Sequence, residues 1–243
     1  MQLITVGTGS KGNCYILKGK SDTLIIEAGV KFSEVEKALN FNFRAVSGCL
    51  ITHEHNDHAR HFEDFEYHGI GIYCSEGTGN AIGLKPCETL ISGKQIAIGE
   101  FQVIPFDVRH DAAEPMGFLI HHEDCGNVLF LTDTYFCDYK FPALNNIIIE
   151  ANYCENIIRG RYENEQLKKF LKNRIIHSHM SLQTCMKTLS ANDLSEVNNI
   201  ILIHLSDSNS DAKVFQKKVS ELTGKNTFIA QNNSVISINK TPF

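Results

Sequence analysis

The sequence lacks the marks of a secreted or membrane-spanning protein. Its start, MQLITVGTGS, contains no basic segment followed by an apolar one, so we expect no signal peptide. The apolar runs reach only about five or six residues, whereas a transmembrane helix needs about 20. We therefore expect a protein with no membrane partner.

Cysteine pairs of the C-x-x-C type are also missing. The eight cysteines stand apart, and several lie in apolar, strand-like segments. They are Cys14, Cys49, Cys74, Cys87, Cys125, Cys137, Cys154 and Cys185. This distribution is typical of buried thiols in a reducing compartment rather than of a disulfide framework or a zinc ribbon. It predicts a cytoplasmic protein.

An excess of positive charge is absent as well. The formal net charge is −5, which gives no overall electrostatic reason to expect nucleic acid, although a local basic rim would still allow it. No linker, repeat or low-complexity segment divides the 243 residues, of which 42% are hydrophobic and 21% charged. Length and composition together predict one domain over residues 1–243 with a sizeable core.

Short apolar segments bounded by turn residues predict strands in both halves of the chain. The expected strands are 3–6, 14–17, 23–27, 47–52, 71–74, 101–106, 117–121, 128–132, 146–150, 200–204, 227–230 and 235–238. Helices are expected at 33–39, opened by a capping box at Ser33, and at 59–67, 161–171, 181–189 and 212–222. Ser181 is the expected N-cap of the fourth helix, and Gly224 ends the last. Two strand-rich halves with interspersed helices predict an α/β protein, an αββα sandwich with polar ligands at strand ends.

The most informative stretch is His53-Glu54-His55-Asn56-Asp57-His58, which follows the apolar segment 49–52. Imidazole nitrogen and carboxylate oxygen are ligands of zinc and related metals. A buried strand that stops in this pattern aims several such ligands at one point. The stretch therefore predicts a metal site rather than a histidine-rich surface loop.

Four other polar residues stand where an apolar strand is expected to end. They are His110, Asp133, Glu150 and His204. A single strand-end histidine or aspartate is more often a capping or hydrogen-bonding residue than a ligand. Because these residues occur together with the histidine motif, they indicate a shared site instead.

With these residues in this order, the sequence resembles the metallo-β-lactamase-fold hydrolases. The motif series is complete and consists of His53, His55, Asp57, His58, His110, Asp133 and His204. The resemblance covers the whole chain. It implies a metallo-β-lactamase αββα sandwich, with two mixed sheets and helices on the outer faces, and a hydrolytic activity.

Within that family the sequence is most similar to the YycJ (WalJ) group of bacterial and phage proteins. The similar segments are 7–14 (GTGSKGNC), 150–152 (EAN), 177–181 (HSHMS) and 204–206 (HLS). This resemblance implies a 5′→3′ exonuclease that acts on DNA rather than RNA. Three places depart from the group's pattern and bear on substrate choice: Glu27 where many relatives have Asp, Tyr153-Cys154 where the group has His-Asp, and the segment 176–181 (IHSHMS) where the group usually reads Ser-Asp-x-Gly-His-Leu-Ser.

The ligands sort into sites for two divalent ions. His53, His55 and His110 offer neutral nitrogens to one ion, Asp57, His58 and His204 offer a mixed set to the other, and Asp133 can bridge both. Two ions roughly 3.5–4 Å apart lower the pKa of a shared water toward about 7, so a metal-bound hydroxide is the expected nucleophile, with Asp57 and Asp133 taking part in catalysis. Nitrogen and oxygen donors suit zinc first, and also manganese or iron.

His179 is expected to act outside the metal shell. It precedes the helix that begins at Ser181, and helix N-termini and imidazolium groups both favour anions. The prediction is a phosphate clamp or a general acid for the departing oxygen, and the alternative is a surface or capping histidine. A basic run over residues 168–174 is interpreted as a solvated helix face.

Three functions are compatible with these residues. The leading one is a two-metal phosphodiesterase that acts on nucleic acid. The alternatives are a small-molecule hydrolase acting on a cyclic phosphodiester or a thioester, and a catalytically idle, metal-binding regulatory protein. A long basic groove beside the metals would favour nucleic acid, whereas a closed apolar pocket would favour a small molecule. The oligomeric state stays open.

Overall fold

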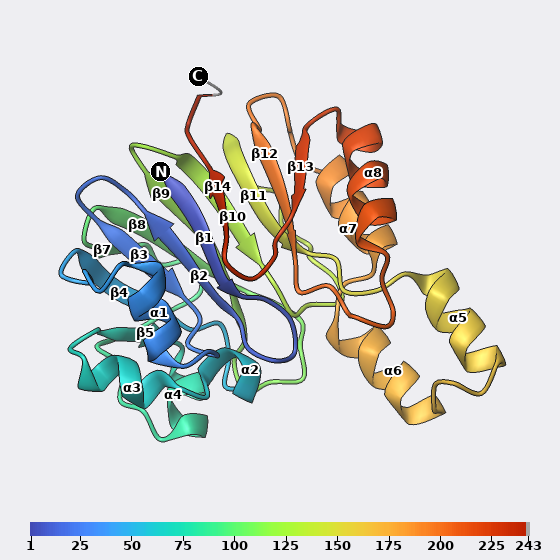
Figure 1. Ribbon diagram of the computed structural model, residues 1–243, viewed down its shortest axis with the longest axis horizontal. Helices are drawn as coiled ribbons and strands as arrows, with labels where there is room; N and C mark the ends of the chain where they lie inside the picture. Colours follow the sequence, from blue (N-terminus) through green and yellow to red (C-terminus); the bar gives the residue numbers. More distant parts are fainter. Residues whose placement is uncertain (242–243) are drawn as a thin grey trace.

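Two seven-stranded sheets packed face to face form the centre of the computed structural model, which describes residues 1–241 (Figure 1). The first sheet, in spatial order, contains β14 (Ser234–Ser237), β1 (Gln2–Gly7), β2 (Cys14–Lys18), β3 (Thr23–Ile26), β4 (Val46–Leu50), β5 (Ile72–Cys74) and β6 (Glu88–Thr89). The second contains β13 (Asn226–Ile229), β12 (Asn199–Ile203), β11 (Leu144–Glu150), β10 (Gly126–Leu131), β9 (Met116–His122), β8 (Phe101–Asp107) and β7 (Ile96–Ile98). Both sheets mix parallel and antiparallel pairs, as expected from the sequence.

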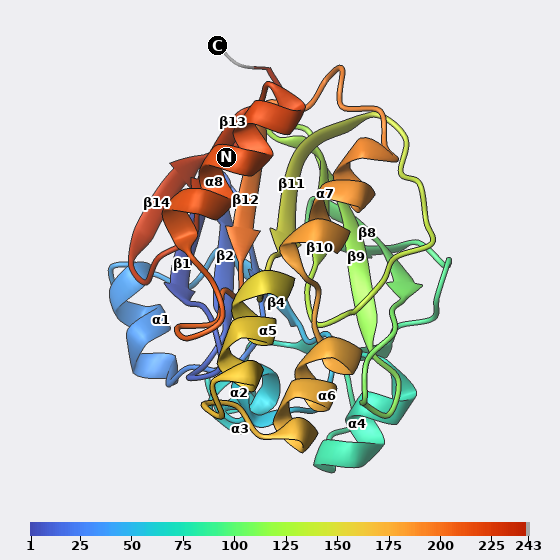
Figure 2. The same cartoon turned by 90° about the vertical axis from the view of Figure 1, so that its right-hand side faces the viewer.

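Helices cover the outer faces of the sandwich, which confirms the αββα expectation (Figures 1 and 2). They are α1 (Phe32–Ala38), α2 (Asn56–Ala59), α3 (Phe62–Tyr67), α4 (Glu76–Ile82), α5 (Glu155–Glu163), α6 (Lys169–Ser178), α7 (Leu182–Ser190) and α8 (Ala212–Thr223). One apolar cluster joins α1 and α3 to the first sheet, and another joins α7 and α8 to the second. Helices α5 and α6 form a pair that projects from one end of the sandwich (Figure 1).

The strands at the centre of the second sheet are apolar on both faces because both faces are buried. In β10, Val128 and Phe130 belong to the core between the sheets, whereas Leu129 and Leu131 pack in the cluster that includes α7 and α8. This alternation explains why the strand reads as a continuous apolar run in the sequence. Such a strand is fixed in register, which in turn fixes the residue that follows it.

The functional edge of the sandwich is set by parallel pairing. Strand β3 pairs in parallel with β4, and β10, β11 and β12 pair in parallel with one another. The carboxyl ends of each set therefore lie together, and the 2.9 Å contact of His58 Nε2 with Asp133 Oδ2 shows that the two sets meet at one edge of the sandwich. Glu27, Asp133 and His204 directly follow or nearly follow three of these strands, with backbone φ angles of 73°, 46° and 54°. This left-handed conformation is uncommon for residues other than glycine.

The expected strands agree with the structure to within one or two residues at each end, but three helix predictions were wrong in detail. Ser33 lies inside α1, whose N-cap is Lys31, so the expected capping box does not form. The helix expected at 59–67 is two helices, α2 and α3. The helix expected at 161–171 crosses a real break: α5 ends at Glu163 and α6 begins at Lys169, because Leu167 turns inward and is buried between them.

Two further predictions concern the cysteines and membrane-spanning helices. Of the eight free thiols, six are buried, but Cys87 is exposed and Cys137 is partly exposed, so the expectation of buried cysteines holds for most of them. Across residues 1–241, none of the helices combines the length and apolar character needed to cross a bilayer.

Candidate active site

The histidine motif forms the turn between β4 and α2. His53 lies in the segment after β4, His55 occupies the N-cap position of α2, and Asp57 and His58 lie within that one-turn helix. The tight turn brings side chains that are one to five residues apart in the sequence to one side of the backbone. The spacing read in the sequence thus corresponds to a single local structure.

Two neighbouring backbone segments hold this turn in place. The Asn13 N–H donates a hydrogen bond to the carbonyl oxygen of Asp57 at 2.7 Å. Gly29 passes so near that a Cβ atom there would lie 1.9 Å from the same oxygen. Only glycine permits this close approach, so the segment after β3 can pack against α2.

Three histidines form a first cluster at the centre of the cleft. His53 Nε2 and His110 Nε2 each lie 3.1 Å from His55 Nδ1. The Ser178 carbonyl oxygen accepts from His110 Nδ1 at 2.8 Å, which leaves Nε2 of His110 without a proton when the ring is neutral. Nitrogens bound at about 2.0–2.1 Å to a tetrahedral zinc ion lie about 3.3 Å apart, so the spacing of these atoms fits a shared ion.

A second cluster, made of Asp57, His58 and His204, lies beside the first. Oδ2 of Asp57 is 3.4 Å from His58 Nε2 and 3.3 Å from His204 Nε2. Oδ2 of Asp133 lies 2.9 Å from His58 Nε2 and 3.9 Å from His204 Nε2. Asp133 also belongs with His53 and His58 to a group whose ligand atoms all lie within 4.8 Å of one another, so it stands between the two clusters.

The charges of the site support a cation there. Glu27, Asp133 and Glu150 are buried, and Asp57 is about three-quarters buried. Within residues 1–241, none of these four carboxylates forms an ion pair with lysine or arginine. Buried carboxylates need a compensating positive charge, which here comes only from histidine protons or from bound metal. The donor set therefore fits divalent ions.

The two clusters have opposite proton affinities. Burial, together with the charge of His58, holds the pKa of His53 well below its ordinary value, and burial likewise lowers the pKa of His110. For His58 burial alone would lower the pKa, but the carboxylates of Asp133 and Glu27 raise it well above the ordinary value. Asp133 and Asp57 outweigh burial in the same way at His204 and raise its pKa to about 9.

Residues behind the histidines fix how their rings point. Glu27 Oε1 lies 3.2 Å from His58 Nδ1 and accepts from the Thr52 hydroxyl at 2.6 Å. That hydroxyl in turn lies 2.9 Å from His53 Nδ1. Glu27 therefore contacts both clusters, directly at His58 and through the Thr52 hydroxyl at His53. It makes these contacts although many family members have aspartate at this position. Such outer partners set the tautomer and the basicity of ligating histidines.

His179 lies where α6 ends, as its C-cap, two residues before the N-cap Ser181 that the sequence predicted for α7. Its Nδ1 is 2.8 Å from Glu150 Oε1 and 2.8 Å from Asp133 Oδ1. Glu150 is itself held by the backbone N–H groups of Met180 and Thr134 at 3.0 and 3.3 Å. Burial alone would lower the pKa of His179, but Glu150 and Asp133 raise it well above its ordinary value.

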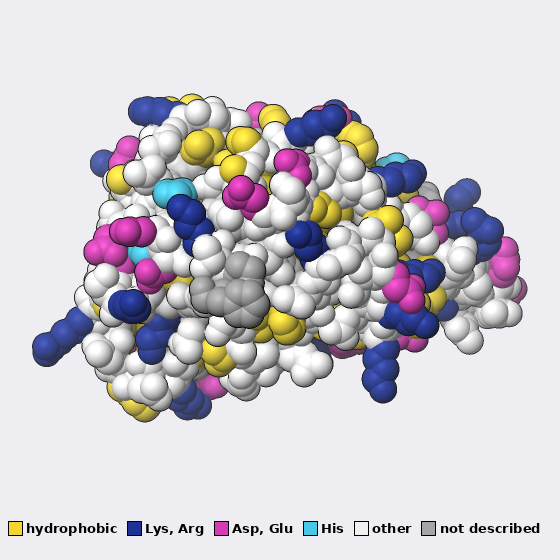
Figure 3. Space-filling view, turned by 90° about the horizontal axis from the view of Figure 1, so that it is seen from above, with side chains coloured by type: hydrophobic (Ala, Val, Ile, Leu, Met, Phe, Trp, Pro, Cys, Tyr) yellow, Lys and Arg dark blue, Asp and Glu magenta, His cyan; other side chains and the backbone are white. Residues whose placement is uncertain are grey.

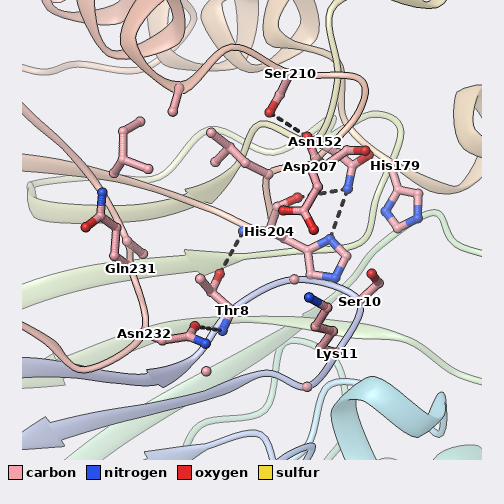
Figure 4. Close-up of a pocket in the computed structure, with 18 of the residues that line it drawn as sticks. Thr8, Ser10, Lys11, Asn152, His179, His204, Asp207, Ser210, Gln231 and Asn232 are labelled. Carbon is pink, nitrogen blue, oxygen red and sulfur yellow. Dashed lines mark hydrogen bonds between the residues drawn. The ribbon is translucent and has the colours of Figure 1, made fainter.

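Two adjoining cavities open onto the clusters. One of about 260 Å³ is lined by ligand residues from both clusters and by Leu171, Arg174 and Ile175 of α6. The other, of about 1030 Å³, extends between the loop after β1 and the loops that follow β12 and β13 (Figure 4). Figure 4 shows its largely polar lining, including Ser10, Lys11, Asn152, Asp207, Ser210, Gln231 and Asn232, with His179 and His204 at one side. The two cavities share Ser10, Ile175, His179 and His204.

The structure brings together all seven residues expected as metal ligands, and it places His179 against them. Sequence reasoning noted Glu150 at a strand end but gave it no role, and it did not assign Asn152, whose amide donates to the His204 carbonyl at 2.8 Å. Arg174 was assigned to a solvated face, yet it lines the cavity above the clusters. The apolar strand before Glu150 was the one available signal for that residue.

A family model described as the beta-lactamase superfamily domain matches residues 24–205 of this chain. The matched segment holds every residue of the two clusters. This chain belongs to the metallo-β-lactamase superfamily. The resemblance predicted from the motif series is thereby confirmed, and so is its hydrolase class.

Curated relatives cover most of the chain at modest identity. The chain is 27% identical over 241 residues to the exodeoxyribonuclease YycJ of Bacillus anthracis, covering 92% of this chain and 89% of that protein. It is 26% identical over 231 residues to the exodeoxyribonuclease WalJ of Streptococcus pneumoniae, covering 84% and 81%. These relatives confirm the expected similarity to the YycJ (WalJ) group.

Solved structures show the same fold at lower identity. The metallo-β-lactamase fold protein YhfI from Bacillus subtilis matches with a TM-score of 0.72 and 13% identity, over 97% of this chain and 99% of that one. The short form of human tRNase Z matches with a TM-score of 0.64 and 15% identity, over 98% and 99%. The arrangement of sheets and helices is thus shared with these two proteins.

Proposed function

We propose that this protein is a metal-dependent phosphodiesterase that acts on nucleic acid, as an exonuclease of the 5′→3′ DNA type. It would work as a single domain over residues 1–243 with two divalent ions, zinc first and manganese or iron as alternatives. The observation that carries the proposal is the convergence of two ligand clusters around Asp133 at the floor of an open, polar cleft. The free thiols support a reducing, cytoplasmic location.

Two further observations support nucleic acid as the substrate. The curated relatives that cover most of this chain are named exodeoxyribonucleases. The larger cavity, of about 1030 Å³, is lined by hydroxyl, amide and charged side chains, whereas a small-molecule thioester or cyclic nucleotide would suit a closed and more apolar pocket. The complete ligand set argues against a regulatory protein with an idle site.

The proposed roles of the residues follow from their contacts. His53, His55 and His110 would hold one ion, Asp57, His58 and His204 the other, and Asp133 would contact both. When bound, two such ions supply Lewis-acid activation of water and of the phosphoryl group at neutral pH. Asp57 and Asp133 are therefore proposed as catalytic residues as well as ligands.

His179 is proposed as the general acid. Glu150 and Asp133 accept from Nδ1 of the ring. This orientation leaves the other nitrogen, Nε2, directed toward the cavities that His179 lines, where it can carry the second proton. A histidine whose pKa is raised is protonated at neutral pH and can give a proton to the departing oxygen. Glu150 is proposed as a positioning residue, because its carboxylate contacts the rings of His179 and His204 and accepts from backbone N–H groups.

One assay tests the proposal directly. Protein loaded with Zn²⁺ or Mn²⁺ is incubated with DNA and RNA strands labelled at the 5′ or the 3′ end, and with bis(4-nitrophenyl) phosphate. We expect release of labelled mononucleotide from the 5′ end of DNA, lost on addition of chelator and restored by metal. Hydrolysis of a thioester or a cyclic nucleotide, with DNA left intact under every metal condition, would contradict it.

A further inference from the structure

One helical segment beside the candidate metal centre carries an excess of positive charge, although the chain as a whole is acidic. Residues 155–178, which comprise α5, α6 and their connection, carry six lysines and arginines against three glutamates, although the whole chain has a net charge of −5. We call this segment the α5–α6 arm. In Figure 3 dark blue side chains, with magenta ones among them, lie at the right-hand end of the molecule, where Figure 1 places α5, and others lie at the left-hand end. The arm therefore offers a local attraction to polyanions that the chain as a whole lacks.

The arm is built as a stable platform. Ile158 and Leu167 are buried with Tyr153 in a small apolar cluster of their own, against which Ile175 and Ile176 pack. The Arg161 guanidinium donates to Asn209 and to the Ser208 carbonyl oxygen, which ties the arm to the loop after β12. The basic side chains are thus presented from an ordered surface.

Helix α6 lies over the candidate metal centre. Its last residue, Ser178, accepts from His110 Nδ1 through its carbonyl oxygen at 2.8 Å and donates from its hydroxyl to Asp111 at 2.7 Å. One turn and two turns earlier, Arg174 and Leu171 line the same cavity as His55, His110 and Asp133. This face of α6 is the roof of the cleft.

Arg174 is the charged group on that roof. It is exposed, and its guanidinium has no hydrogen bond or ion pair to any of residues 1–241. Other cations of the arm are engaged differently, since Arg161 binds the loop after β12 and Lys172 lies 4.2 Å from the centre of the Tyr162 ring. An unpaired guanidinium that faces a metal cleft is suited to a backbone phosphate.

Phe170 continues the same face outward. It precedes Arg174 by four residues, which places it about 40° around the helix and about 6 Å further along its axis. Its side chain is 64% exposed, which is unusual for phenylalanine and leaves the ring face open. Base stacking on exposed aromatic rings is a standard feature of proteins that bind single strands.

The dimensions of the roofed cleft favour a single strand over a duplex. The cavity between α6 and the ligand clusters measures about 260 Å³. This volume is below the roughly 300–1,000 Å³ of a typical pocket for a drug-sized ligand, so it suits one nucleotide unit better than a stack of base pairs. A single strand can place its phosphates toward Arg174 and the centre.

We propose that the α5–α6 arm clamps one single-stranded DNA chain over the metal centre, with Arg174 on a backbone phosphate next to the scissile one and Phe170 stacked on a base. This deepens the proposed nuclease function and rests on it for the identity of the strand. On this proposal Arg174, the last cation of the basic run read in the sequence as a solvated face, holds the substrate.

Binding is measured with the metal-loaded protein and a fluorescein-labelled, nuclease-resistant phosphorothioate strand of roughly 12 nucleotides, a length within the usual range of single-strand sites. We expect Arg174→Ala to weaken binding and to reduce the slope of log affinity against log salt by about 0.7, the change for one lost phosphate contact on a single strand. Phe170→Ala should weaken binding roughly fivefold or more with the slope unchanged.

The matched control is Lys169→Ala, which removes one exposed positive charge from the same helix. Lys169 lies about 140° around α6 from Arg174 and does not line the cavity. Phe170→Tyr should restore binding and Phe170→Leu should not, because only the former keeps an aromatic ring. Circular dichroism and melting curves of all variants should match those of the unaltered protein.

The proposal is overturned if Arg174→Ala has the affinity and salt slope of Lys169→Ala, if Phe170→Leu binds as well as Phe170→Tyr, or if a blunt duplex binds more tightly than the single strand. These results are separate from the fate of the proposed function, because the probe strand is not cut. A protein that cleaves DNA but binds unchanged in both arm variants would refute only the clamp. A protein that binds as expected but cleaves no phosphodiester would refute only the nuclease.

Discussion

The two ligand clusters lie side by side but differ in charge. The cluster of His53, His55 and His110 contains only imidazoles, and burial lowers the pKa of two of them. The cluster of Asp57, His58 and His204 includes a carboxylate, faces Asp133, and has histidines whose pKa is raised. Without metal, the first cluster offers imidazole lone pairs to an ion. The second is a network of ion pairs between protonated histidines and carboxylates.

This difference indicates how each cluster would take up an ion. The first can accept a cation with little proton release, because the lowered pKa of His53 and of His110 keeps these two rings neutral near pH 7. The second must exchange histidine protons for the cation, and its carboxylates attract that cation strongly once the protons leave. We therefore expect the first site to be the simpler binding site and the second to be the one most sensitive to substitution and pH.

The strongest test of this comparison is Asp133→Ala, since the Asp133 carboxylate lies between the clusters. Metal content should fall from about two ions per chain toward one, and phosphodiesterase turnover should fall by more than about 10³-fold, in line with the loss of a main electrostatic element of a hydrolytic site. Elemental analysis of protein never exposed to chelator, together with the rate on labelled DNA, measures both.

Asp57→Ala should act on the second cluster only and leave the three-histidine site occupied. Asp193→Ala, at an exposed position remote from the site, is the matched control and should change neither quantity.

Two bound ions and near-normal turnover in the Asp133→Ala protein would show that Asp133 does not connect the clusters.

His179→Ala tests a residue that touches Asp133 but belongs to neither metal-binding cluster. Both ions should stay bound and the melting temperature should be kept, while the rate on DNA falls roughly 10²–10⁴-fold, the usual range for a positioned proton donor. With bis(4-nitrophenyl) phosphate the loss should shrink, because nitrophenolate departs without a proton. A loss of equal size on both substrates would favour a phosphate clamp, and no loss on either would return His179 to a structural role.

The pH dependence of metal binding should separate the clusters. The pKa of His204 is about 9 and that of His58 is also raised, so both rings are protonated near pH 7 in metal-free protein. Binding at the second cluster expels these protons, and its affinity should rise by up to about 100-fold per pH unit as pH increases toward about 9. His53 and His110 are already neutral, so affinity at the first cluster should change little above about pH 7. Chelator competition over this range measures both, and parallel slopes would contradict the comparison.

The mildest change is Glu27→Gln, which keeps the size of the side chain but removes its charge behind His58. Metal affinity at the second cluster should fall roughly 10- to 100-fold, the usual effect of losing an outer partner of a ligating histidine. The first cluster should change less, because Glu27 reaches His53 only through the Thr52 hydroxyl. Glu27→Asp, which restores the residue that many family members carry, is the control for charge.

Much of the fold was predictable because strand signals are local. Apolar runs such as residues 128–131 and 200–203 define strands that are buried on both faces, and their ends place Asp133 and His204. The helices were less predictable where tertiary contacts decide them. Leu167 breaks the helix expected at 161–171 because it packs inward, and the Ser33 capping box does not form because α1 starts one residue earlier, at Phe32.

The candidate site divides in the same way. The seven ligand residues stood out because their types and order are distinctive over short stretches. Glu150, Asn152 and Arg174 did not, because their importance lies in contacts between segments far apart in the chain. Arg174 reads as one cation among several in the sequence, and only the position of α6 over the cleft distinguishes it from Lys169.

The left-handed backbone at Glu27, Asp133 and His204 has a consequence for how such a site is inherited. Each of these residues is held in a conformation that costs of order 1–3 kcal/mol for a side chain other than glycine. A mutation to glycine at any of them would relieve that backbone cost while removing a group on which the chemistry depends. In a lineage that no longer needs the activity, glycine should therefore spread early at these three positions.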